Sequence, residues 1–190
     1  MNKSQRFQIL VESGKTVFSC ADLSSLWQME VGYTRIMASR MEKAGLLYRL
    51  SHGFYAFGKN YSREELANRL VTPSYLSFNS ALFRAGVCFQ QSAVFSSVGL
   101  VNTVKESDGE TFKYYSMKPS LFFKTQGIDY KGPVSIATPE RAILDCFYFG
   151  LLPAIDNPEK LNSLTFKTLL LLYPKTVQKK AESFISKYHL

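Results

Sequence analysis

Three helical patterns follow one another at the start of the chain, and their order limits the folds open to it. Apolar residues recur at helical spacing over 7–11. Ser19 is followed three residues later by Asp22, a pair that caps a helix start and predicts a second helix over 20–27. A third helix is predicted over 33–44, where the pattern stops at a glycine. One helix followed by two more with a short turn between them is the helix-turn-helix layout.

The third helix has two chemically different sides when its residues are placed at intervals of about 100°. The side predicted to pack against the core consists of Tyr33, Thr34, Met37, Ala38 and Met41. The side predicted to face outward consists of Arg35, Ile36, Ser39, Arg40 and Lys43. Arginine pairs with guanine in the major groove, and lysine or serine contacts phosphate. On a lone helix such a face is more often only a solvated surface, so the next segment decides between the two interpretations.

That next segment reads as two short strands, over 46–50 and 54–57, joined by a turn that contains Gly53. A hairpin directly after a helix-turn-helix is a wing, and a wing commonly approaches the phosphate backbone or the minor groove. Arg49 lies on the first strand and His52 at the tip. The order of elements therefore predicts a winged helix-turn-helix domain over residues 1–60 that binds nucleic acid. Its candidate DNA-binding residues are Tyr33, Arg35, Ser39, Arg40, Lys43, Arg49 and His52.

The distribution of charge supports this interpretation. The chain of 190 residues has 23 Lys and Arg against 15 Asp and Glu, a formal net charge of +8. Residues 1–60 hold eight basic and four acidic side chains, so half of the net charge lies in less than a third of the chain. The other half is expected to be spread over residues 61–190. A concentrated positive charge favours a polyanion such as double-stranded DNA as the partner.

Residues 61–190 are predicted to form a C-terminal domain of mixed α/β type with a small, mostly antiparallel sheet, which makes the whole chain α+β. A capping box of Ser62 and Glu65 begins its first helix. Further helices are predicted over 78–85, from Pro139 onward, and in two pieces after 161 with Pro174 between them. Strands are predicted over 98–104, 112–115, 121–123 and 134–137, the first two joined through a turn at Asp108 and Gly109.

Metal, disulfide and cofactor sites are not indicated. Cys20, Cys88 and Cys146 lie far apart in the sequence, and His52 and His189 have no metal-binding spacing. No phosphate-binding glycine loop is present, so we expect no catalytic residue, no cofactor and no metal. The apolar runs are far shorter than the roughly 20 residues of a membrane span, and no signal peptide is recognised. We therefore expect a cytoplasmic protein with no membrane partner.

Two alternatives stay open at this point. A nuclease or transferase could hold its substrate with the winged helix and use Glu140 or Asp145 as a carboxylate, although these positions do not share a helix face. Arg141 and Asp145, at i and i+4, are more simply an intrahelical ion pair. The second alternative is an adaptor whose winged helix contacts protein and not DNA.

Three segments of the chain together resemble the AbiEi family of abortive-infection antitoxins and related transcriptional regulators, which belong to type IV toxin-antitoxin systems. The segments are Gly45 to Tyr55 at the wing, Tyr75 to Gly86, and Ala137 to Asp145. The last of these, Ala-Thr-Pro-Glu-Arg-Ala-Ile-Leu-Asp, is the most specific. The motif residues, with either a structural or an antitoxin role, are Ser80, Leu82, Gly86, Thr138, Pro139, Glu140, Arg141 and Asp145.

The resemblance implies a repressor that binds inverted repeats in the promoter of its own operon and an antitoxin that counteracts a nucleotidyltransferase-like toxin. Some members of such families neutralise the toxin without a stable complex, so direct toxin binding is not implied. A palindromic site would take two copies of the protein, while the oligomeric state in solution stays open. The wing turn departs from the usual Arg-Gly, because His52 precedes Gly53 here. A stand-alone regulator without a toxin partner is a further alternative.

Overall fold

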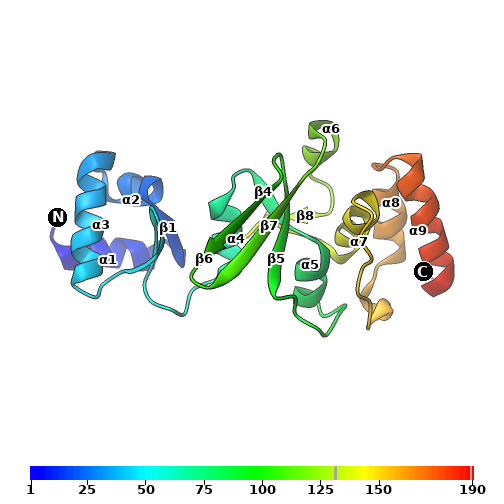
Figure 1. Cartoon of the computed structure of the whole chain (residues 1–190), viewed down its shortest axis with the longest axis horizontal. Helices are drawn as coiled ribbons and strands as arrows, with labels where there is room; N and C mark the ends of the chain where they lie inside the picture. The colour runs from blue at the N-terminus through cyan, green and yellow to red at the C-terminus, as the bar shows by residue number, and fades with distance from the viewer. Residues whose placement is uncertain (131, 189) are drawn as a thin grey trace.

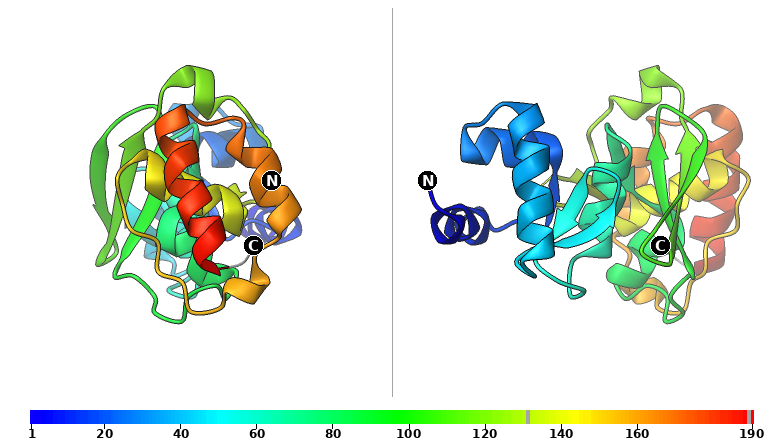
Figure 2. Two further views of the ribbon diagram at one scale, coloured as in Figure 1. Left: turned by 90° about the vertical axis from the view of Figure 1, so that its right-hand side faces the viewer. Right: turned by 60° about the vertical axis from the view of Figure 1, so that its left-hand side comes forward.

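The computed structural model describes residues 1–130, 132–188 and 190. The chain runs along the long axis of an elongated molecule, with the two termini towards opposite ends (Figure 1). The first helices lie at one end, a β-sheet lies in the middle, and the last helices lie at the other end. Figure 2 shows the same succession from two further sides.

The N-terminal part is a winged helix-turn-helix, as predicted. Its helices are α1 (Lys3–Glu12), α2 (Cys20–Trp27) and α3 (Val31–Lys43), and its strands are β1 (Val17–Ser19), β2 (Tyr48–Ser51) and β3 (Phe54–Ala56). The Ser19 hydroxyl accepts from the Asp22 N–H and the Asp22 carboxylate accepts from Ser19, which confirms the capping box at the start of α2. The strands form an antiparallel sheet in the order β1-β3-β2, called the small sheet below.

Helix α3 begins two residues earlier than predicted, and its buried side is narrower. Thr34, Ala38 and Met41 are buried and Met37 is half-buried, but Tyr33 is 65% exposed. Placing Tyr33 in the core-facing stripe was therefore wrong. Tyr33 lies at the edge of the stripe, one position before the first buried residue.

The C-terminal part is a second, mixed sheet covered by helices. The strands are β4 (Ser74–Leu76), β5 (Val94–Gly99), β6 (Thr103–Ser107), β7 (Glu110–Ser116), β8 (Ile128–Asp129) and β9 (Ile136–Ala137). The helices are α4 (Arg63–Leu70), α5 (Phe78–Arg84), α6 (Pro119–Phe122), α7 (Pro139–Tyr148), the 3-10 turn η1 (Pro158–Lys160), α8 (Ser163–Leu170) and α9 (Lys175–Tyr188). The strand order is β6-β7-β5-β4-β9-β8, and this sheet is called the large sheet below.

The sequence predicts a small, mostly antiparallel sheet in the C-terminal part. The large sheet is mostly antiparallel, as predicted, but local patterns missed two of its pairings. The pairs β6–β7, β4–β5 and β8–β9 are antiparallel, and Asp108 and Gly109 form the β6–β7 turn, but β5–β7 and β4–β9 are parallel. The strand predicted over 98–104 is broken between β5 and β6. The strand predicted over 121–123 is wrong, because Pro119 occupies the first turn of a short helix there.

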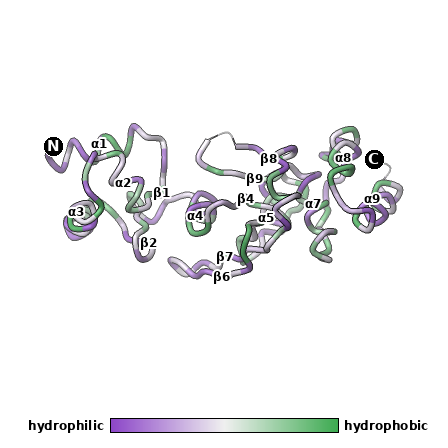
Figure 3. Tube along the Cα trace, turned by 90° about the horizontal axis from the view of Figure 1, so that it is seen from above, coloured by the Kyte–Doolittle hydropathy of each residue, from purple (hydrophilic) through white to green (hydrophobic). Residues whose placement is uncertain are grey.

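Alternating residues of β4 pack on opposite faces of the large sheet. Tyr75 belongs to the core formed with α5, α7, α8 and α9, whereas Leu76 belongs to a cluster on the other face. In Figure 3, α9 alternates between polar and apolar segments along its length, as expected of a helix with one side in that core. The large sheet is therefore covered on both faces.

The cluster on the second face joins the two parts of the molecule, and we call it the shared cluster. Its buried members are Val17, Leu50, Ala56, Tyr61, Leu66, Ala67, Leu76, Phe112, Tyr114 and Val134. In β1, Val17 points into the shared cluster while Phe18 points into the core of α1, α2 and α3. The small sheet thus has apolar contacts on both faces. The contacts of one face join residues before and after residue 60, where the sequence predicts a domain boundary.

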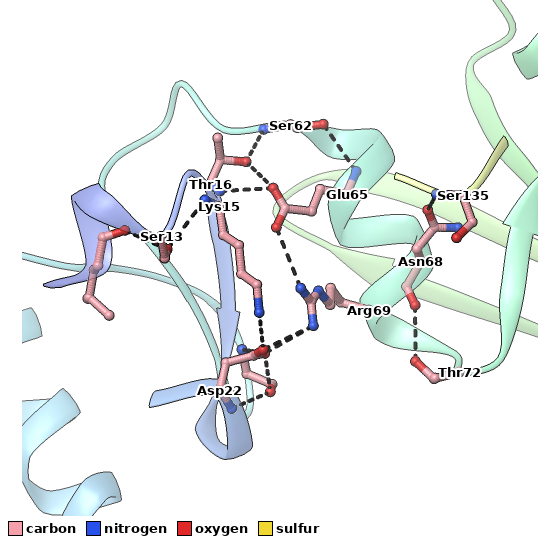
Figure 4. A network of polar contacts seen from close by, with 12 residues as sticks. Ser13, Lys15, Thr16, Asp22, Ser62, Glu65, Asn68, Arg69, Thr72 and Ser135 are labelled. Atoms are coloured by element: carbon pink, nitrogen blue, oxygen red, sulfur yellow. Dashed lines mark hydrogen bonds and ion pairs between the residues drawn. The ribbon is translucent and has the colours of Figure 1, made fainter. Parts of the chain in front are cut away.

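Helix α4 lies between the two sheets and makes polar contacts with both parts of the molecule (Figure 4). The carboxylate of Glu65, which is fully buried, accepts from the N–H and hydroxyl of Thr16 at 2.9 and 2.7 Å. Arg69 donates to Asp22 at 3.1 Å, and Asn68 accepts from the Ser135 N–H at 2.7 Å. Ser62 caps α4 by accepting from the Glu65 N–H, as predicted. The predicted return bond of the capping box is replaced, because the Glu65 carboxylate binds Thr16.

A second polar junction lies at the turn of the β6–β7 hairpin. The Asp108 carboxylate accepts from the hydroxyls of Tyr48 at 2.7 Å and Tyr61 at 3.0 Å. The Ser107 hydroxyl donates to the Leu50 carbonyl at 3.1 Å. Tyr48 and Leu50 belong to the first strand of the wing, so hydrogen bonds with the C-terminal part fix the position of this strand.

Asp22 makes the polar contacts between α4 and the N-terminal part sensitive to acid. Burial alone would raise the pKa of Asp22, but bonds from Lys15 and Ser19 and the charge of Arg69 outweigh it and lower the pKa below its ordinary value. Ionised Asp22 therefore contributes stability above the unfolded pKa of about 3.9, and this contribution is lost as the pH falls through the lower folded-state pKa. We expect the free energy of unfolding to decrease below about pH 4, and to decrease less in Asp22→Asn. Urea unfolding at a series of pH values measures this, and equal slopes in both proteins would contradict it.

Candidate nucleic-acid interface

An open hollow of about 500 Å³ lies between α3, the start of α2 and the wing. Arg35 and Ser39 line it from α3, and Arg49 and His52 line it from the wing. Four of the seven predicted DNA-binding residues are therefore brought together. Tyr55 is a buried part of the lining, and burial raises the pKa of its hydroxyl.

The other three predicted residues lie on α3 outside the hollow. Tyr33, Arg40 and Lys43 are exposed and continue the outward face of the helix. Within the described ranges 1–130, 132–188 and 190, Arg35, Arg40 and Lys43 form no ion pair. Their charges are thus available to an anionic ligand.

The two wing residues contact each other. The guanidinium of Arg49 lies 3.4 Å from Nδ1 of His52, and both side chains are exposed. Gly53 follows with φ +81°, a left-handed conformation that favours glycine in the turn. The wing tip therefore presents one guanidinium and one imidazole ring.

Two basic side chains counted in the N-terminal charge are not available to a ligand, because one is buried and the other is paired with a carboxylate. Arg6 is buried, donates to the sulfur of Met29 at 2.8 Å and lies over the ring of Trp27. Lys15 pairs with Asp22 at 2.8 Å. The exposed positive charge of this part is consequently more concentrated on α3 and the wing than the sequence count indicates.

The downstream charge is also less evenly spread than expected. Residues 61–157 contain nine basic and nine acidic side chains, whereas residues 158–190 contain six lysines and two glutamates. These lysines belong to η1, α8 and α9, at the end of the molecule opposite to α3 (Figure 1). The protein thus has two basic ends and a neutral middle.

Sequence reasoning left two apolar residues of the outward face without a role. Val31 is 43% exposed and lines the hollow, and Ile36 is 52% exposed. Val31 was missed because the helix begins before Tyr33. The helical wheel did place Ile36 on the outward side, and this position was the sequence signal that could have identified it as an interface residue.

The carboxylates of the enzymatic alternative are enclosed. Asp145 is fully buried and accepts from the hydroxyls of Ser77 at 2.6 Å, Tyr75 at 3.1 Å and Tyr173 at 2.6 Å. Burial raises the pKa of Asp145, against the opposing effects of Arg141 and the hydroxyl donors. Arg141 is also fully buried, with Nε 3.6 Å from the carboxylate, so the predicted i, i+4 pair is a core pair and not a surface pair. Glu140 is 4% exposed and accepts from the Asn162 N–H at 2.8 Å.

The remaining motif residues also make structural contacts. Thr138 caps α7 and Pro139 occupies its first turn, as predicted. The Ser80 hydroxyl accepts from the Ser96 N–H at 3.0 Å, and Leu82 is fully buried in the core. Gly86 ends α5 with φ +69°.

Two other kinds of site are absent from the described residues. Among them, no group of three His, Cys, Asp or Glu side chains is arranged to hold a metal ion. No helix in the described part of the chain is long and apolar enough to span a membrane. His189 lies outside the described residues.

The N-terminal part is a winged helix-turn-helix with an exposed basic face on α3. Residues 5–58 match a family model described as transcriptional regulator, AbiEi antitoxin, which confirms the resemblance over this range. The motifs at 75–86 and 137–145 lie outside the matched residues, where the resemblance stays a prediction. The comparison with curated proteins found no match.

Proposed function

We propose that this protein is a repressor that binds double-stranded DNA at inverted repeats in its own promoter and has antitoxin activity against a nucleotidyltransferase-like toxin. It would act in the cytoplasm. The observation that carries the proposal is the arrangement of Arg35, Ser39, Arg49 and His52 around one hollow, in a segment that matches a transcriptional-regulator model.

The proposed binding mode assigns a role to each group. Helix α3 would enter the major groove, with Arg35 and Arg40 contacting guanine or phosphate and Ser39 contacting a base edge or phosphate. Lys43 would neutralise a phosphate, and Tyr33 would contact the groove at the start of the helix. Arg49 and His52 would donate to the backbone from the wing. Phosphate contacts of this kind make the affinity fall steeply with salt.

Arg35→Ala and Arg40→Ala are each expected to weaken operator binding by about 1–3 kcal/mol, or about 5- to 150-fold. Both side chains are exposed and free of ion pairs among the described residues, so the melting temperature should not change. Electrophoretic shifts on the DNA directly upstream of the gene measure the affinity.

Lys179→Ala is the matched control, because it removes an equally exposed positive charge from α9 at the other end of the molecule. We expect it to change the affinity less than twofold. If both arginine variants bind like the wild type, α3 is not the DNA-reading helix. If Lys179→Ala loses as much as they do, the footprint extends to the second basic end.

The antitoxin role needs its own experiment, because the described contacts assign the motif residues structural positions. A neighbouring nucleotidyltransferase-like gene would supply the toxin. Growth arrest by that gene should be relieved by the full chain, and it should also be relieved by Arg35→Ala if DNA binding and antitoxin activity are separate. A gene neighbourhood without such a toxin would favour a stand-alone regulator.

A further inference from the structure

Ile36 is an apolar side chain on the otherwise polar outward face of α3. It is 52% exposed, and Arg35, Arg40 and Lys43 around it are exposed as well. The core of the winged helix takes Ala38 and Met41 from the opposite side of the helix. Among the described residues, Ile36 belongs to none of the hydrophobic clusters. Its side chain therefore adds little to the stability of the fold.

We infer that Ile36 is a specificity-determining residue that contacts the C5-methyl group of thymine, and so selects an A·T pair within the operator. The inference rests on the proposed function, because it names what one residue of that same interface reads. The major groove displays hydrogen-bonding groups on all four bases and an apolar group only on thymine. Ile36 is the sixth residue of α3, in the half of a recognition helix that contacts base edges.

The charges around Ile36 distinguish DNA from a second copy of this chain as the occupant. Two copies meeting through this face would bring Arg35, Arg40 and Lys43 of each against those of the other. Like charges pressed together in this way oppose association. The same cations attract the phosphate groups that border a major groove, so the surroundings of Ile36 fit DNA.

Replacing thymine by deoxyuridine tests the contact, because deoxyuridine keeps the base pair and lacks only the methyl group. The full-length protein first selects duplexes from a randomised library, and each thymine of a selected duplex is then replaced in turn. At one or two positions, wild-type binding should become about fourfold weaker for the methyl removed. Ile36→Ala should bind thymine and deoxyuridine equally at those positions. Its melting temperature should match the wild type, because the side chain is exposed and alanine is the better helix former.

Leu164→Ala is the matched control, since Leu164 is 77% exposed on α8 and should leave the thymine preference intact. The inference would be overturned if the wild type bound DNA in a salt-dependent way but responded to deoxyuridine at every position as Ile36→Ala does. The proposed function would still stand in that case. Self-association of the wild type that Ile36→Ala abolishes would overturn the inference as well. A protein that selects no duplex would overturn the proposed function, and the inference with it.

Discussion

Phe112→Ala is expected to lower the free energy of unfolding by about 3–5 kcal/mol, and the loss should be detected by a reporter in the other part of the molecule. Phe112 is fully buried on β7, stacks on Phe95 with ring centroids 5.4 Å apart, and belongs to the shared cluster. Removal of its ring leaves a cavity in the shared cluster, to which Val17, Leu50 and Ala56 of the small sheet also belong. The winged helix should lose stability although the substitution lies in the large sheet.

Trp27 makes this measurable, because it is the single tryptophan of the chain and lies in the core of the winged helix. Urea unfolding followed by Trp27 fluorescence and by far-UV circular dichroism should give one transition, shifted equally in both signals. Phe123→Ala is the control, since Phe123 is 64% exposed, and it should shift neither signal by more than about 0.5 kcal/mol. If Phe112→Ala does not shift the urea unfolding transition that Trp27 fluorescence reports, the two parts unfold separately.

Arg141→Met should lower the free energy of unfolding by a similar amount, about 3–5 kcal/mol, because it leaves the buried carboxylate of Asp145 without its positive partner. The guanidinium of Arg141 donates to the Lys124 and Gln126 carbonyls, both at 3.0 Å, besides lying beside Asp145. Methionine fills much of the volume but supplies none of these donors. Asp145 would then lose its compensating charge, and the two carbonyls would lose a donor each.

Arg84→Met is the matched control for this change. The Arg84 side chain is about half exposed and pairs with Glu64 at the surface, where an ion pair is worth roughly 0–1 kcal/mol. Thermal and urea unfolding of the two variants should therefore differ by several kilocalories per mole. A loss in Arg141→Met no larger than in Arg84→Met would mean that the buried pair contributes no more than a surface pair.

Helix starts and the wing could be predicted from the sequence because their causes are local. Ser19 with Asp22, and Thr138 before Pro139, place a capping side chain within three residues of the group it satisfies. Gly53 likewise marks its own turn. Such signals do not depend on what the rest of the chain does.

Pairings between distant segments could not be predicted in the same way. The parallel pairing of β5 with β7 depends on where the chain returns after β6, and no residue of either strand encodes that return. Asp108 reads as a turn residue, and only the folded chain shows that it accepts from Tyr48 and Tyr61. Glu65 reads as a helix cap, yet tertiary contact with Thr16 outweighs the local bond.

The candidate site was predictable to the extent that one helix and one hairpin form it. Angular position alone placed Arg35, Ser39 and Ile36 on one side of α3, and the structure keeps them exposed or half-buried. The same reasoning placed Tyr33 in the core, because a helical wheel does not show which positions of a helix the neighbouring elements cover. Burial of Arg141 and Asp145 was equally out of reach, because it depends on α8 and α9 closing over α7.

The two-sided small sheet has a consequence for protein engineering. A recombinant fusion that grafts residues 1–60 onto a foreign effector would leave Val17, Leu50 and Ala56 facing water instead of their partners in α4 and the large sheet. Such a chimera should be poorly soluble and should lose the support behind its wing. A transplantable unit would have to carry α4, or replace those three side chains by polar ones, before the proposed DNA binding could be moved to a new protein.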